Sequence, residues 1–169
     1  PWEVLYPKVT GVYLKGKLNG WTSGKDIILK MLDILTVKGG TNKVIEYFGP
    51  GVSSISATGK GTICNMGAEL GATGSIFPYD LRMAAYLRGT ERSALAGLAD
   101  KNSALLRADP EVEANPGKFF DRIVEIDLTA RQIVDLPSDG HRLHLKADHP
   151  EEPRAQVPAK RGIAQRHTR

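Results

Sequence analysis

The chain has 169 residues, of which 41% are hydrophobic and 25% charged, a composition typical of one globular domain with a buried core. Its single cysteine, Cys64, excludes a disulfide framework and a four-thiolate metal site within the chain, and fits a reducing compartment. No apolar run approaches the roughly 20 residues of a membrane helix, and no signal-peptide pattern is present. A start at Pro1 rather than Met suggests a piece cut from a longer protein.

The formal charge of +4 is concentrated near the C-terminus. Residues 139–169 hold seven Lys or Arg and four Asp or Glu, whereas the first 138 residues are nearly neutral. Acidic residues interrupt this basic segment and no aromatic residues interleave it, which argues against nucleic-acid binding. His141 and His144, followed by His149, also suggest a metal site, but two ligands three residues apart without supporting carboxylates are a weak signal.

The first fifty residues predict a strand, a helix and a second strand. Residues 9–14 alternate β-branched and aromatic side chains, and residues 43–48 form a similar run. Between them, residues 25–35 carry apolar side chains at helical spacing behind an N-cap at Ser23. Glycines 39–40 then predict a helix end with a left-handed residue. This order predicts a β-α-β unit with two parallel strands.

The next segments continue the alternation of helices and strands. Residues 53–71 read as helical but are rich in glycine, which indicates close approach of the backbone either to another element or to a ligand. Helices are predicted over 80–88, capped by Asp80, and over 91–106, and a last strand over 122–128. In the helix over 91–106 the side chains expected to face inward are Leu95, Leu98, Ala99 and Leu105.

These elements predict an α/β fold with three layers, α/β/α, around a mainly parallel sheet. The predicted domain covers residues 1–136. Residues 137–169 are polar, contain several prolines and lack periodicity, so they are expected to form a basic, disordered tail.

Asn65 and Glu69 are the most informative polar pair. They stand four residues apart, which on a helix places both on one face. A carboxamide beside a carboxylate could hold water, a metal-bound hydroxyl or a substrate hydroxyl. From spacing alone, an exposed pair on a surface helix is the commoner explanation.

Several motifs together resemble the second domain of the aconitase family. The resemblance runs in order and nearly continuously from Pro1 to about Leu128, and we find no match from there to Arg169. The motifs that carry it are L-N-G-W-T-S-G-K-D-I-I-L at 18–29, V-K-G-G-T at 37–41, E-Y-F-G-P-G-V at 46–52, T-I-C-N-M-G-A-E-L-G-A-T at 62–73 and F-P-Y at 77–79.

The resemblance implies that the chain is a fragment of aconitate hydratase, a lyase that isomerises citrate to isocitrate through cis-aconitate. In that family a [4Fe–4S] cluster keeps one iron free of cysteine, and this iron acts as a Lewis acid. By motif, Asn65 would contact the cluster environment, and Glu69, the candidate catalytic residue, would hydrogen-bond iron-bound water or hydroxyl. The three cluster cysteines are absent here, and Cys64 matches none of them. We therefore expect no metal ligands, no bound cluster and no activity from this chain alone.

Other assignments stay open at this point. Within the superfamily they are methylisocitrate hydratase, homoaconitase, isopropylmalate isomerase and an iron-regulatory, RNA-binding relative. A different class would be a non-catalytic α/β module whose tail binds a partner or nucleic acid. The partners expected for the fragment are the remaining aconitase domains and, in the intact enzyme, a tricarboxylic acid, with no membrane and no nucleic acid. The expected compartment is the cytoplasm or the mitochondrial matrix.

Overall fold

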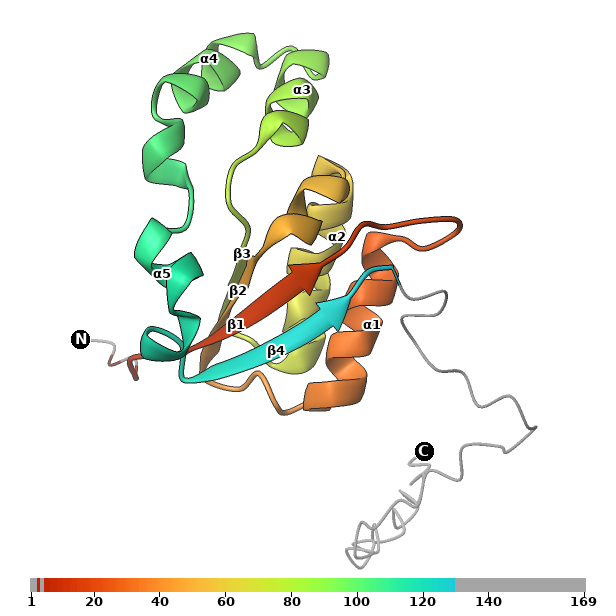
Figure 1. Ribbon diagram of the computed structural model, residues 1–169, viewed down its shortest axis with the longest axis vertical. Coiled ribbons are helices and arrows are strands. Elements are labelled where there is room, and N and C mark those ends of the chain that lie inside the picture. The colour runs from red at the N-terminus through yellow and green to blue at the C-terminus, as the bar shows by residue number, and fades with distance from the viewer. Residues whose placement is uncertain (1–2, 4, 130–169) are drawn as a thin grey trace, which may run out of the picture. The chain divides into compact units, whose positions relative to one another are not determined.

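Four parallel strands form a single sheet in the order β3-β2-β1-β4 (Figure 1). The computed structural model describes residue 3 and residues 5–129. Its strands are β1 (Lys8–Lys15), β2 (Lys43–Phe48), β3 (Gly74–Ile76) and β4 (Arg122–Asp127). The predicted α/β class with a mainly parallel sheet is therefore confirmed, while the predicted tail lies outside the described residues.

One face of the sheet is buried under helices α1 (Gly24–Leu35) and α2 (Ala57–Met66). The strand register places Val12 beside Tyr47 on one side and Val124 on the other, so alternate residues of three strands point to this face. Burial of these apolar side chains is the main stabilising contribution. The core consists of Val12, Leu14, Ile27, Ile28, Met31, Leu35, Ile45, Tyr47, Val52, Ile55, Ile63, Leu70, Val124, Ile126 and Leu128.

Helix α1 begins where the sequence predicts it. The Ser23 backbone N–H donates to the Asp26 carboxylate at 2.7 Å, and the Ser23 hydroxyl contacts the same carboxylate at 2.9 Å. The helix ends at Leu35, the last residue of the predicted range, and the residue with positive φ is Thr36, at 61°. The prediction of a left-handed residue at glycines 39–40 is wrong, because the chain already leaves the helix at Thr36. Gly40 serves packing instead, since a Cβ there would lie 2.7 Å from the Leu70 carbonyl oxygen.

The second face of the sheet carries a thinner layer. Phe120 lies over Gly11, where a Cβ would approach its ring to 2.5 Å, and its ring centroid lies 5.1 Å from that of Phe48. Tyr13 extends this aromatic group, with 5.3 Å between its ring centroid and that of Phe48. The covering segment contains two short helices, α5 (Pro110–Ala114) and η4 (Pro116–Lys118). The third layer is thus built of single turns and aromatic rings.

Residues 81–106, here called the α3–α4 arm, follow strand β3 and stand away from the sheet (Figure 1). The arm consists of α3 (Leu81–Gly89), α4 (Ser93–Lys101) and the 3₁₀ helix η3 (Ser103–Leu106). The single helix predicted over 91–106 is therefore divided in two. The predicted inward orientation of Leu95, Leu98 and Leu105 is wrong, because all three side chains are exposed.

Strand β3 was not predicted, because its three residues are too few to show an alternating pattern. Its parallel pairing with β2, in which Ser75 lies opposite Ile45, holds these residues in the strand conformation. Two 3₁₀ helices, η1 (Pro50–Ser54) and η2 (Gly67–Leu70), flank α2.

Candidate active site

The segment that carries Asn65 and Glu69 returns from the carboxyl edge of the sheet to its amino edge. Helix α2 follows β2 and η1, and η2 leads into β3, whose first residue pairs with the start of β2. The Gly40 backbone N–H donates to the Leu70 carbonyl at 2.8 Å, and Thr41 forms a bridge with Ala72. These contacts hold the end of the segment beside the amino end of β2.

Both candidate residues are exposed to solvent. Ser56 caps α2 by accepting a hydrogen bond from the Gly59 N–H at 3.0 Å, and the buried side of α2 then carries Lys60 and Ile63. The side chains of Asn65 and Glu69 form no hydrogen bond or ion pair with another residue in the described part of the chain. Their amide and carboxylate atoms are therefore available to a group that this part of the chain does not supply.

The backbone around the pair differs in detail from the prediction. Helix α2 ends at Met66, so Asn65 lies in its last turn while Glu69 lies in the 3₁₀ helix η2. A 3₁₀ helix has three residues per turn, and its side chains do not continue the face of the preceding α-helix. The structure keeps both residues on one short exposed segment rather than on a single helical face.

Some glycines in and around this segment allow close contact between neighbouring elements, while others do not. A Cβ on Gly24 of α1 would lie 2.8 Å from the Gly59 carbonyl oxygen, so the two helices approach closely there. A Cβ on Gly67 would lie 2.6 Å from the Ser75 hydroxyl of β3. Gly61, by contrast, has open space around it. Helix–helix packing thus explains Gly24, and helix–strand packing explains Gly67.

Cys64 is half-buried between α2 and β3, and its thiol lies 3.6 Å from the Ser75 carbonyl oxygen. Burial raises the pKa of this thiol, which favours the protonated form. A metal or cluster ligand must be a thiolate, so this environment disfavours that role. Among the described residues, no group of three or more His, Cys, Asp or Glu side chains is placed to hold a metal ion.

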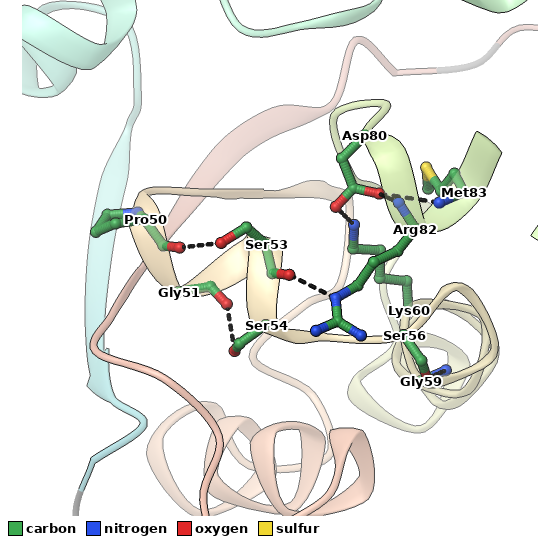
Figure 2. A network of polar contacts seen from close by, with 10 residues as sticks. All are labelled: Pro50, Gly51, Ser53, Ser54, Ser56, Gly59, Lys60, Asp80, Arg82 and Met83. Carbon is green, nitrogen blue, oxygen red and sulfur yellow. Dashed lines mark hydrogen bonds and ion pairs between the residues drawn. The ribbon is translucent and has the colours of Figure 1, made fainter. Parts of the chain in front are cut away.

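A buried ion pair that the sequence did not reveal joins α2 to the α3–α4 arm. Lys60 is only 1% exposed, and its ammonium forms an ion pair with the Asp80 carboxylate (Figure 2). The other carboxylate oxygen of Asp80 caps α3 by accepting from the N–H groups of Arg82 at 3.1 Å and Met83 at 3.0 Å. The sequence did hold one indication that Lys60 is buried. Lys60 stands three residues before the apolar Ile63, which places both side chains on the same, buried side of α2.

An apolar cavity of about 360 Å³ lies between α2 and α3. Phe77, on its wall, stacks on the buried Tyr47 with ring centroids 4.4 Å apart and planes within 5°. Burial, followed by the nearby Cys64, raises the pKa of the Tyr47 hydroxyl, which has no hydrogen-bond partner among the described residues. The cavity is lined by Ala57, Lys60, Gly61, Cys64, Phe77, Tyr79, Met83, Tyr86 and Leu87.

Comparison with known proteins identifies the family. The family model described as "Aconitase family (aconitate hydratase)" matches residues 1–164. The chain belongs to the aconitase family. It is 60% identical over 128 residues to "Probable aconitate hydratase, mitochondrial" of Caenorhabditis elegans and 58% identical over 128 residues to "Aconitate hydratase, mitochondrial" of Schizosaccharomyces pombe. Each of these matches covers 76% of this chain and 16% of the relative.

The family match extends further than the motifs suggested. The expectation that the resemblance ends near Leu128 is wrong for the family model, which continues to residue 164. A Dictyostelium discoideum relative, "Probable aconitate hydratase, mitochondrial", also aligns over 152 residues at 52% identity, covering 88% of this chain and 19% of its own length. The chain thus spans less than a fifth of the length of these aconitase-family relatives.

No helix in the described part of the aconitase-family chain combines the length and the apolar character needed to cross a membrane.

Proposed function

We propose that this chain forms one wall of the active site of an aconitate hydratase, which isomerises citrate and isocitrate through cis-aconitate. The observation that carries the proposal is the T-I-C-N-M-G-A-E segment, which presents Asn65 and Glu69 to solvent without partners among the described residues. A carboxylate in this state can accept a hydrogen bond from a substrate hydroxyl or a water, and can hold or release a proton there. The adjacent amide can donate and accept at the same centre.

The cofactor proposed for the full-length enzyme is a [4Fe–4S] cluster, which supplies Lewis-acid chemistry when bound. The described residues do not fit a set of cluster ligands, since Cys64 is the single cysteine and its environment favours the thiol. Cluster ligands would therefore come from other parts of the enzyme. What this chain contributes is the orientation of Asn65 and Glu69 at the edge of the reacting centre.

The proposed partners are the remaining domains of the same enzyme and its tricarboxylic acid substrate. The relatives are named mitochondrial, which supports the mitochondrial matrix over the cytoplasm as the compartment. A domain over residues 1–136 followed by a separate segment over 137–169 stays a prediction.

The relatives reported above are named aconitate hydratases, which favours that activity over the related hydro-lyases and over an iron-regulatory relative. A non-catalytic module with a nucleic-acid-binding tail has no support from these names. Its test is RNA binding by the chain with and without residues 137–169, since that alternative requires an affinity that falls with removal of the segment and with salt.

The decisive experiment exchanges the matching 128 residues of the Schizosaccharomyces pombe enzyme for those of this chain. We expect the chimaera to interconvert citrate and isocitrate, whereas the isolated chain does neither. In the chimaera, Glu69→Gln should lower kcat about 10²–10⁴-fold, the usual contribution of a general acid or base. The matched control, Glu111→Gln on the exposed surface of α5, should leave kcat unchanged.

The absorbance of the iron–sulfur cluster must be equal in the chimaera and in both variants, so that a lost cluster is not mistaken for a lost proton transfer. Full activity of the Glu69→Gln variant would contradict the assigned role of Glu69. Turnover by the isolated chain would contradict the division of the active site proposed here.

A further inference from the structure

Helix α2, which carries Asn65, is anchored to the rest of the chain by two buried side chains. Of its ten residues, Lys60 and Ile63 are the buried ones. Ile63 belongs to the apolar core under the sheet, whereas Lys60 brings a charged group to the buried side of the helix. A charge removed from water is stable only beside a partner, so the place of that partner constrains the helix.

The partner of Lys60 is a carboxylate whose own position is fixed by α3. The Lys60 ammonium forms an ion pair with Asp80, whose second carboxylate oxygen accepts hydrogen bonds from the N–H groups of Arg82 and Met83 (Figure 2). Through Nε, the Arg82 guanidinium donates to the Ser53 carbonyl at 2.7 Å, in the 3₁₀ helix η1 that leads into α2. Asp80 therefore offers the ammonium a partner in one defined place.

The ion pair crosses a gap that apolar packing leaves unfilled. The cavity of about 360 Å³ lies between α2 and α3, and both Lys60 and Met83 lie on its wall. Contact between the apolar surfaces of the two helices therefore does little to set their relative orientation. The Lys60 side chain makes the direct link from α2 to the start of α3.

The rotation of α2 about its own axis decides where Asn65 points. Asn65 follows Lys60 by five residues, which at 3.6 residues per turn places it about 140° around the helix, away from the buried side. Lys60 is accordingly buried and Asn65 exposed. A rotation that carried the ammonium toward water would turn Asn65 toward the protein. It would also displace η2, which follows α2 directly and carries Glu69.

We propose that Lys60 and Asp80 are a positioning pair for the reaction, which sets the rotation of α2 and thereby the orientation of Asn65 and Glu69. This inference rests on the proposed function, in which Asn65 and Glu69 act on the substrate. In this role the pair acts through α2 and does not itself touch the substrate. Misplacing a reacting group by about 1 Å can lower a rate about 10²-fold, so a remote pair can matter to the reaction.

The test is Asp80→Asn in the chimaera. An asparagine still caps α3 as well as an aspartate does, but it leaves the buried Lys60 ammonium without a counter-charge. The ammonium should then turn toward water and rotate α2. We expect kcat to fall about 10- to 100-fold, because the groups that α2 and η2 carry are misplaced. KM should change little, since the interactions lost are those made in the transition state.

Two further variants separate positioning from stability. Adding Lys60→Met to Asp80→Asn should restore kcat, because no unpaired charge then remains buried. In the Glu69→Gln chimaera, Asp80→Asn should lower kcat far less, because the group that it misplaces has already been removed. A general structural loss would instead lower kcat by the same factor in both backgrounds.

Ile126→Ala is the matched control for stability. Ile126 is 4% exposed and lies in β4, at the opposite edge of the sheet from β3. Its truncation should lower the melting temperature but leave kcat unchanged at a temperature at which every variant is folded. The cluster absorbance must again be equal in all variants.

Cys64 provides a readout that does not depend on activity. It is the single cysteine of the chain, is half-buried, and follows Lys60 by four residues on the same face of α2. Rotation of α2 should therefore expose the thiol. N-ethylmaleimide should label the isolated chain faster in Asp80→Asn than in the parent or in Ile126→Ala, and the double variant should return to the parent rate.

Several results would overturn the positioning pair alone. They are unchanged kcat in an Asp80→Asn chimaera that still loses activity with Glu69→Gln, equal losses in the two backgrounds, and unchanged labelling of Cys64. An Asp80→Asn chimaera that fails to fold would assign the pair to stability and overturn the proposal as well. Full activity of the Glu69→Gln chimaera would contradict the proposed function instead, while faster labelling would still report the rotation of α2.

Discussion

The sheet with α1 and α2 differs from the α3–α4 arm in what holds each of them in place. In the first region, side chains such as Ile28 and Tyr47 are fully buried by elements of the same chain. In the arm, the buried residues of the two α-helices are Ala84 and Ala96, while several leucines are exposed. Apolar burial fixes the sheet region, whereas the arm depends on a small number of polar contacts. The two regions should therefore respond to different substitutions.

The largest effect is expected where a polar contact of the arm is broken. Asp80→Ala removes the cap of α3 and leaves the buried Lys60 ammonium without its partner, a loss of about 3–5 kcal/mol for a buried pair. Hydrogen exchange should accelerate in α3 and α4 before it changes in α1. Asp109→Ala is the control, since Asp109 occupies the N-cap position of α5 without a side-chain cap hydrogen bond.

A double variant, Lys60→Met with Asp80→Asn, tests whether the charge or the shape of this contact matters. Removing both charges together should cost far less than Asp80→Ala, because no unpaired charge remains buried. If the double variant loses as much stability as Asp80→Ala, the ion pair is not the cause of the loss.

The second effect concerns apolar packing and should be confined to the sheet region. Ile28→Ala leaves a cavity under the sheet and should lower the free energy of unfolding by about 2–5 kcal/mol. Leu98→Ala, at an exposed position of α4, should change it by less than about 0.5 kcal/mol in the isolated chain. Urea unfolding of both variants measures the difference, and equal losses would remove the distinction between the regions.

Two glycines of the candidate active-site segment give opposite, smaller effects. Gly61→Ala introduces a methyl group into open space within α2 and should stabilise the fold by about 0.5–1 kcal/mol. Gly67→Ala forces a methyl group against the Ser75 hydroxyl and should destabilise it by about 1–3 kcal/mol. Thermal unfolding of the pair measures both signs. A stabilising Gly67→Ala would mean that the Ser75 hydroxyl can rotate away from the new methyl group, or that η2 can move away from β3.

The smallest effect is a pH dependence at the junction of the two regions. Glu46 lies beside Leu105 and Leu106 of the arm, and burial, followed by the charge of Asp109, raises its pKa. A carboxyl whose pKa is raised on folding binds more protons in the folded state, so stability falls as pH rises from its ordinary value of 4.5 to the raised pKa.

Glu46→Gln should therefore remove this fall and make the chain more stable than the parent at neutral pH. Unfolding midpoints between pH 4 and pH 7 measure the effect, with Glu111→Gln as an exposed control. A larger fall in the Glu46→Gln variant would reverse the assigned sign.

Much of the sheet region could be predicted from the sequence. Strands β1, β2 and β4 and the start of α1 follow from alternation, helical spacing and the capping box at Ser23 and Asp26. The positive φ at Thr36 could not, because threonine rarely adopts that backbone conformation, and strand β3 could not, because pairing with β2 decides it. Helical spacing on α4 predicted a buried face, but spacing carries no information on what covers that face.

For the candidate site too, some features follow from the sequence and others only from the tertiary structure. The sequence by itself determined the α/β class, the family motifs and the nomination of Asn65 and Glu69, because local patterns and short motifs lie within single segments. Only the tertiary structure decided that these two residues lie exposed near the amino edge of the sheet. It alone brought Lys60 to Asp80, twenty residues away, and left Leu95 and Leu98 of α4 exposed, because burial and charge pairing depend on which segments meet in space.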